Sequence, residues 1–169
     1  MINIKRIFLV SIAIFIIISA GACSKSPEIP TTHQIILALC ENEIDLPAGN
    51  IYSSDFDMDS KNYLTDTLLS AYLGEPDTQK YKSDWISYSI FIPSGKHVCE
   101  FAAIYCSTPE SVIDTAKLLL SRLDSIKKHA ADEFSSYIEQ ARVITRGNYV
   151  LLIISSDTQS LIKTLKKVC

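Results

Sequence analysis

The sequence predicts an α+β fold: a two-layer sandwich in which a four-stranded antiparallel sheet carries its helices on one face. Two observations in the C-terminal half predict it. There are two hairpins, each made of two strand-like segments joined by a short turn. Each hairpin is followed by a segment whose apolar residues have helical spacing. The order strand, strand, helix, strand, strand, helix favours one sheet that buries a single face against both long helices.

The first hairpin leads into the longest predicted helix. Apolar and polar side chains alternate over residues 85–92, residues 93–96 turn the chain, and residues 97–105 return as the second strand. Thr108 and Pro109 then suit the N-cap and the first position of a helix. Helical spacing predicts that its buried face comprises Val112, Ile113, Ala116, Leu119, Leu120, Leu123 and Ile126.

The second hairpin leads into the last predicted helix. Its strands are residues 143–146 and 149–155, and Gly147-Asn148 between them places glycine first, as a type II′ turn requires. Ser156 and Gln159 match a capping box. The helix that follows is expected to bury Leu161, Ile162, Leu165 and Val168.

One or two short helices are predicted ahead of the sheet. Apolar residues cluster on one side over residues 34–43 and again over residues 63–73, where Gly74 ends the helix. Residues 46–50 are a predicted turn, and residues 75–82 are a predicted polar linker.

The beginning of the chain has the build of a secretory signal peptide. Lys5 and Arg6 precede an apolar stretch over residues 7–18, and small residues follow up to Cys23. A membrane-spanning helix is the alternative, but it needs about 20 apolar residues. Only about 16 residues separate Arg6 from Cys23, so the pattern favours a cleaved leader over residues 1–22.

The run Ala20-Gly21-Ala22-Cys23 resembles a bacterial lipobox. Such a motif is cleaved between Ala22 and Cys23, and the cysteine sulfur carries a diacylglycerol. An ordinary secreted protein with a chance cysteine is the alternative. Several acyl chains such as palmitate give stable anchoring, and residues 23–32 would form a polar tether. We therefore expect a lipoprotein anchored in the cell membrane on its extracytoplasmic face, in the cell envelope.

Composition limits the partners of the mature chain. Residues 23–169 number 147, enough for one core domain at 83–169 with the segment 33–82 packed on it. The leader holds two of the 16 basic residues and none of the 19 acidic ones, so the mature part carries a formal charge of −5. Because nucleic acids and anionic lipid surfaces select basic patches, nucleic acid is excluded as an expected partner. The expected partners are the membrane, through the lipid, and a protein or small molecule.

Four cysteines besides Cys23 form either disulfides or free thiols: Cys40, Cys99, Cys106 and Cys169. Cys99 and Cys106 lie on one predicted strand, about 23 Å apart at about 3.3 Å per residue. A disulfide needs Cα atoms within about 7 Å, so these two cannot pair with each other. Two pairing schemes remain, as does the fully reduced chain. The absence of a CxxC or Cys/His cluster disfavours metal binding.

An acidic loop suggests a weak calcium site, the one cofactor alternative. Asp55, Asp57 and Asp59 are two residues apart, as in the first half of a calcium-binding loop. The sixth position holds Ser60 where such a loop needs glycine, and the twelfth holds Asp66, which is shorter than the usual glutamate. A solvated acidic loop is the simpler interpretation, and no other cofactor is expected.

No catalytic residue is predicted. The chain lacks a Gly-x-Ser-x-Gly elbow, a glycine-rich phosphate loop and a His-Glu-x-x-His pair. Arg122 lies near the buried edge of the long helix, where it would pair with Asp124, with Glu110 or with a carboxylate across the sheet. Anion recognition is its functional alternative. Tyr149 belongs to a group of strand tyrosines that would line an aromatic surface or cover the sheet.

Two segments carry a resemblance to a known family. "FAAIYCSTPESVIDTAKLLLSRLDSIKKH", with Arg122 and Leu123, and "ARVITRGNYVLLIISSD", with the turn at 147–150, are similar to a family of bacterial lipoproteins named domain of unknown function 4358. The resemblance covers about residues 55–168. It implies a lipid anchor and an anaerobic Gram-positive origin, which favours free thiols. It brings no catalytic residues.

Three functional hypotheses follow. The first is a lipid-anchored, non-enzymatic binding or interaction module, motivated by the missing catalytic motifs and by a sheet with one open face. The second is a calcium-dependent surface module that uses the loop at 55–66. The third is a hydrolase without a recognisable motif, which would need a pocket with perturbed titratable groups.

Overall fold

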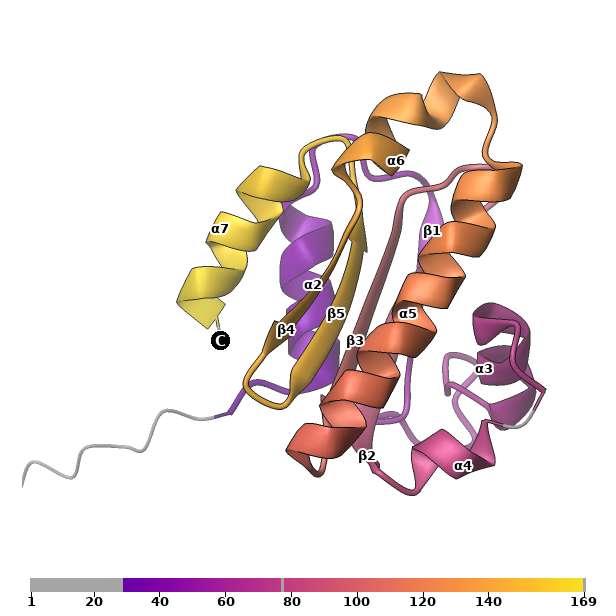
Figure 1. Cartoon of the computed structure of the whole chain (residues 1–169), viewed down its shortest axis with the longest axis vertical. Coiled ribbons are helices and arrows are strands. Elements are labelled where there is room, and N and C mark those ends of the chain that lie inside the picture. The colour runs from indigo at the N-terminus through magenta and orange to yellow at the C-terminus, as the bar shows by residue number, and fades with distance from the viewer. Residues whose placement is uncertain (1–28, 77, 169) are drawn as a thin grey trace, which may run out of the picture.

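The computed structural model describes residues 29–76 and 78–168, which form one antiparallel sheet with helices against it (Figure 1). The α+β class is confirmed. The five strands lie in the order β1-β2-β3-β5-β4, with bounds β1 Gly49–Ser53, β2 Trp85–Pro93, β3 Glu100–Cys106, β4 Arg142–Arg146 and β5 Tyr149–Ile154. The helices are α2 Thr32–Asn42, α3 Asp66–Leu73, α4 Gln79–Lys82, α5 Pro109–His129, α6 Ser135–Gln140 and α7 Thr158–Val168, with a 3-10 turn η1 at Asp132–Phe134.

The prediction of four strands was wrong, because β1 adds a fifth at the edge of the sheet. β1 pairs antiparallel with β2, with Tyr52 opposite Ile90. Gly49 and Asn50 are turn-forming residues, so the local pattern over 46–50 indicated a turn. The partner strand lies beyond α3 and α4 in the sequence. Only the tertiary fold brings this segment to the sheet.

The prediction of a two-layer sandwich with its helices on one face was also wrong. α3 and α5 pack on one face of the sheet, and α2 and α7 pack on the other (Figure 1). The reason lies in the central strands. β5 is buried along its whole length, with Val150, Leu152 and Ile154 in the α5 cluster and Leu151 and Ile153 in the α2/α7 cluster. A strand that is apolar on both sides needs cover on both faces.

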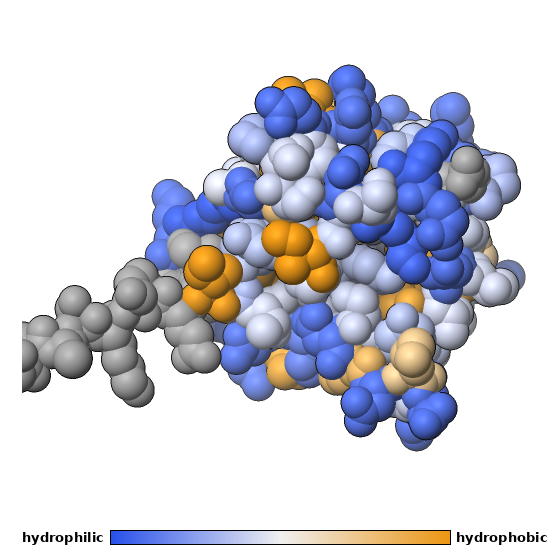
Figure 2. Space-filling model, turned by 90° about the horizontal axis from the view of Figure 1, so that it is seen from below, coloured by the Kyte–Doolittle hydropathy of each residue, from blue (hydrophilic) through white to orange (hydrophobic). Residues whose placement is uncertain are grey.

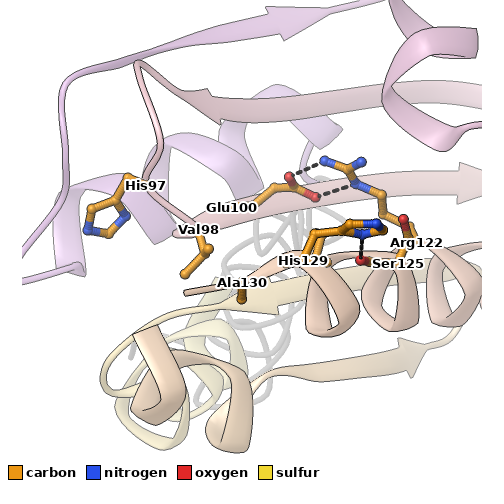
Figure 3. A pocket seen from close by; sticks show the side chains of 8 residues that line it. His97, Val98, Glu100, Arg122, Ser125, His129 and Ala130 are labelled. Atoms are coloured by element: carbon orange, nitrogen blue, oxygen red, sulfur yellow. Dashed lines mark hydrogen bonds and ion pairs between the residues drawn. The ribbon is translucent and has the colours of Figure 1, made fainter. Parts of the chain in front are cut away.

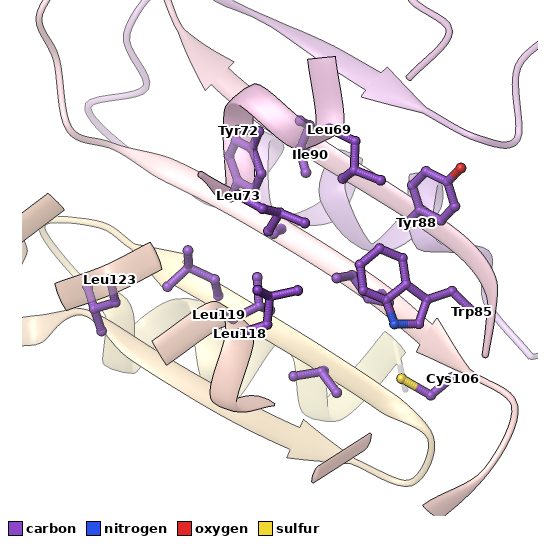
Figure 4. Packing of buried hydrophobic residues seen from close by; sticks show 14 of the residues in the cluster. Leu69, Tyr72, Leu73, Trp85, Tyr88, Ile90, Cys106, Leu118, Leu119 and Leu123 are labelled. Atoms are coloured by element: carbon purple, nitrogen blue, oxygen red, sulfur yellow. The ribbon is translucent and has the colours of Figure 1, made fainter. Parts of the chain in front are cut away.

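The core under α5 is built from two helices and three strands (Figure 4). Leu118, Leu119 and Leu123 of α5 meet β2, β3 and β5, and Tyr72 of α3 closes one side. The predicted buried face of α5 was partly wrong. Ile113 and Leu120 are 59% and 47% exposed, whereas Leu118 is 8% exposed. The apolar stripe is wider than the contact with the sheet, and the sheet decides which part of it is buried.

The predicted N-cap of α5 is confirmed, and that of α7 was wrong. Thr108 caps α5: its side chain accepts from the backbone N–H of Ser111, and Pro109 stands at the first position, as predicted. For α7 the predicted capping box at Ser156 and Gln159 was wrong. The helix starts at Thr158, and the side chain of Asp157 accepts from the backbone N–H of Ser160. Both starts still place a short polar side chain on free backbone N–H groups.

The expected leader, its cleavage site at Ala22 and Cys23, and the last cysteine, Cys169, lie outside the described residues. Within 29–76 and 78–168, none of the helices combines the length and the apolar character that crossing a bilayer requires.

Candidate functional site

A pocket that contains a buried ion pair and two histidines lies where α5 ends and β3 begins (Figure 3). Its volume is about 240 Å³. One wall comes from the last two turns of α5, and the other comes from the loop and first residue of β3. Its lining consists of His97, Val98, Glu100, Arg122, Ser125, Ile126, His129 and Ala130.

A two-point ion pair forms the floor of this pocket. Arg122 of α5 donates from Nε to Glu100 Oε1 at 3.2 Å and from Nη2 to Oε2 at 2.8 Å. Tyr72 of α3 donates its hydroxyl to the same Oε1 at 2.7 Å, and the guanidinium lies 4.8 Å from the tyrosine ring centre. The buried carboxylate therefore holds three hydrogen bonds from two helices. Such pairing is what allows a buried charge to persist.

The pKa shifts follow from this packing. Burial lowers the pKa of Arg122, but its hydrogen bonds and charge interaction with Glu100 outweigh burial and raise the pKa above its ordinary value. Burial, and then the neighbouring charge of Glu100, raise the pKa of Tyr72 well above its ordinary value. Arg122 therefore stays charged, and Tyr72 stays a neutral hydrogen-bond donor.

Two histidines flank the ion pair with opposite hydrogen-bonding roles. His97 Nδ1 accepts from the backbone N–H of Cys99 at 3.0 Å, so the proton of its neutral ring is on Nε2. His129 Nδ1 lies 2.7 Å from the carbonyl oxygen of Ser125, which can only accept, so Nε2 of its neutral ring is an acceptor. The His97 ring also packs edge-on against Phe134, with centroids 5.0 Å apart. Both histidines line the pocket beside the ion pair.

Of the predicted site residues, Arg122 belongs to this pocket and Tyr149 does not. Arg122 pairs with a carboxylate on the sheet and not with Asp124 or Glu110, so one of its three structural alternatives is confirmed. Tyr149 is buried, packs against Tyr105 with ring centroids 4.6 Å apart, and donates its hydroxyl to the Pro30 carbonyl. It fastens the start of the described chain to the sheet.

The predicted acidic loop is not assembled as a cation site in the described residues. Asp66 is the first residue of α3, where it accepts from Gln79 at 2.6 Å and pairs with Lys82. Asp55 accepts from Thr32 at 3.3 Å. Among residues 29–76 and 78–168 no group of three His, Cys, Asp or Glu side chains is arranged to hold a metal ion. Asp57 and Asp59 are among these residues and belong to no such group.

The sheet separates the described cysteines. Cys106 lies in the core under α5, whereas Cys99 lies in the α2/α7 core and Cys40 packs against that core. A bond between Cys40 and Cys106 is therefore blocked by the sheet, and all three described cysteines are free thiols. Burial is the largest cause that raises the pKa of each, that of Cys40 to about 12. None of the three is a thiolate at neutral pH.

Sequence reasoning missed Glu100 and Tyr72 as members of the site. One signal was available for Glu100: it stands in the apolar run Cys99-Glu100-Phe101-Ala102-Ala103, and a charged residue in a buried strand requires a partner. Tyr72 carried no such signal, because a helical tyrosine beside leucines is typical of an ordinary core residue.

Comparison with protein-family models, with curated proteins and with solved structures gave no match. The resemblance to the lipoprotein family therefore stays a prediction from the two sequence segments that carry it.

Proposed function

We propose that this chain is a lipid-anchored, extracytoplasmic binding module that takes a small uncharged polar molecule at the pocket between α5 and β3. The observation that carries the proposal is the saturated ion pair on the pocket floor. The oxygens of Glu100 are occupied by Tyr72 and Arg122, so this carboxylate is held as a structural acceptor and not poised as a base. The raised thiol pKa values likewise favour binding over nucleophilic catalysis.

The class of ligand follows from charge and size. Glu100 and Arg122 neutralise each other, and the pocket lies at the C-terminal end of α5, where the helix dipole disfavours anions. His97, His129 and Ser125 supply hydrogen-bonding groups, while Val98, Ile126 and Ala130 supply apolar surface. The volume of about 240 Å³ is below the range of about 300–1,000 Å³ usual for ligand sites. A small polyol or sugar fits these properties better than phosphate does.

Nuclear magnetic resonance of ring-labelled histidines tests the pocket. Glucose, added as an uncharged polyol probe, is expected to shift the His97 and His129 resonances in a saturable way, and inorganic phosphate is expected to shift them less. His33 is the internal control, because its ring packs against Phe56, 4.7 Å away between centroids. Equal shifts at all three histidines, or stronger shifts with phosphate, would contradict the proposed ligand class.

Metabolic labelling tests the anchor. Cells grown with radiolabelled palmitate are expected to yield a labelled protein in the membrane fraction, and Cys23→Ser is expected to abolish the label. An unlabelled wild-type chain at full precursor mass would refute the anchor without bearing on the pocket.

A further inference from the structure

The molecule has two ends, and α5 connects them (Figure 1). At the anchor end, as we call it, lie Pro30, the second described residue, and the β4–β5 turn, with α5 starting beside them. Tyr149, the first residue of β5, holds Pro30 there by its hydrogen bond to the Pro30 carbonyl. At the pocket end lie His97 and the last turn of α5, with His129.

The distance between the two ends is longer than the reach of the segment that joins Cys23 to the described chain. α5 has 21 residues, which is about 30 Å at about 1.5 Å per residue. Only six residues lead from Cys23 to Ile29, a reach of at most about 22 Å at about 3.6 Å per residue. A lipid on Cys23 would therefore hold the anchor end close to the bilayer, and the helix length would keep the pocket away from it.

The surface of the anchor end suits this placement. Figure 2 views this end and shows hydrophobic patches among polar residues, one of them beside the start of the described chain. Ile29 and Ile86, the second residue of β2, are 63% and 61% exposed. Two acidic residues lie at the same end: Glu110 is in the first turn of α5, and the Asp84 carbonyl accepts from the backbone N–H of Ser107 just before that helix.

We propose that the anchor end rests on the bilayer surface and that the pocket opens away from it, so that the ligand arrives from the aqueous phase and not from the lipid. This orientation rests on the proposed lipid anchor. It extends that proposal by excluding membrane lipids as the source of the ligand.

Two positions on α5 make a matched pair for the test. Glu110 and Lys128 are both exposed and are 18 residues apart, which is five helical turns, so they project from the same side about 27 Å apart. A nitroxide is attached at either position of the full-length lipidated chain through a ketone-bearing amino acid, which leaves the cysteines untouched. The chain is reconstituted in phosphatidylcholine vesicles that contain a nickel-chelating lipid.

The nitroxide at Glu110 is expected to lose its resonance amplitude through relaxation by the lipid-bound nickel, and the nitroxide at Lys128 is expected to keep it. Equal loss at both positions, loss only at Lys128, or no loss at either in a palmitate-labelled chain would overturn the orientation while the anchor stands. Absence of the palmitate label would overturn the anchor and the orientation together.

A second comparison tests the apolar contact. Ile29→Ser combined with Ile86→Ser is expected to reduce the loss at Glu110. The control is Ile44→Ser, because Ile44 is 84% exposed and follows the end of α2 at the opposite end. If the control reduces the loss as much as the pair does, the apolar contact at the anchor end is refuted.

Discussion

Arg122 and Glu100 join the longest helix to the centre of the sheet by two parallel hydrogen bonds, of 3.2 and 2.8 Å. The two residues are 22 positions apart in the sequence. Their pairing also sets the floor of the pocket, so stability and the proposed binding site depend on the same contact.

Removing one partner of this pair is expected to destabilise the fold. Glu100→Gln leaves the guanidinium of Arg122 half-buried without a counter-charge, which we expect to lower the free energy of unfolding by about 3 kcal/mol. The double variant Glu100→Gln/Arg122→Met is expected to recover most of the loss. Urea unfolding measures both. Asp114→Ala is the control: it breaks the exposed pair with Lys117 at 2.9 Å, expected to be worth less than about 0.5 kcal/mol. Equal losses of unfolding free energy in Glu100→Gln and Asp114→Ala would show that the buried ion pair contributes no more to stability than the exposed one.

Leu118→Ala is expected to lower the free energy of unfolding more than Leu120→Ala does, although the two residues are only two positions apart. Leu118 is buried in the core cluster under α5, so its truncation is expected to cost about 2–3 kcal/mol. Leu120 is largely exposed, and its truncation is expected to cost less than about 0.5 kcal/mol. Thermal or urea unfolding of both variants decides between this face of α5 and the face that helical spacing predicted. A larger loss of stability in Leu120→Ala than in Leu118→Ala would instead support the buried face that helical spacing predicted.

Stability is expected to fall at alkaline pH. The pKa of Cys40 is raised from 9.0 to about 12 in the fold, because burial and nearby Glu41 and Glu43 disfavour the thiolate. The unfolded chain loses the thiol proton first, so this contribution is complete below about pH 9 and disappears as the pH rises towards 12. Unfolding measured from pH 7 to pH 11 should show the decline, and Cys40→Ala should show a smaller one. A Cys40→Ala profile identical to that of the wild type would assign the decline to other groups.

Calcium is expected to leave the melting temperature unchanged. Asp66 is engaged by Lys82 and Gln79, whose hydrogen bonds lower its pKa, and Asp55 is engaged by Thr32. Calcium would have to break these contacts and bring the loop together. Differential scanning fluorimetry at millimolar calcium checks this, with magnesium as the matched ion. A rise with calcium but not with magnesium would revive the calcium-dependent module.

Gly147→Ala is expected to cost about 1 kcal/mol because Gly147 has φ 53° in the β4–β5 turn. An added Cβ would meet no atom within 4 Å, so the cost comes from the backbone conformation alone. Gly49→Ala is the steric comparison, since its Cβ would lie 2.5 Å from the Ile92 carbonyl oxygen. Urea unfolding should rank Gly49→Ala as the more damaging change, and the opposite ranking would contradict both assignments.

The candidate site could be predicted only in part. Arg122 stood out because a charged residue on the edge of an apolar helix face needs a partner. The sequence left its partner undecided between nearby and distant carboxylates, because spacing alone does not determine which strand lies next to Arg122. The histidines at 97 and 129 had no metal-ligand spacing, and their shared pocket arises because a loop and a helix end meet there.

The sequence by itself determined the local features: the N-cap of α5 at Thr108, the turn at Gly147, the order of β2, β3, α5, β4, β5 and α7, and the antiparallel pairing within each hairpin. These depend on backbone preferences and hydrogen bonds between residues close together in the chain. The tertiary structure alone decided that β1 joins the sheet, that α7 packs opposite α5, and that Glu100 receives Arg122 and Tyr72. Those outcomes depend on which apolar surfaces bury each other over long sequence separations, and no short segment carries that information.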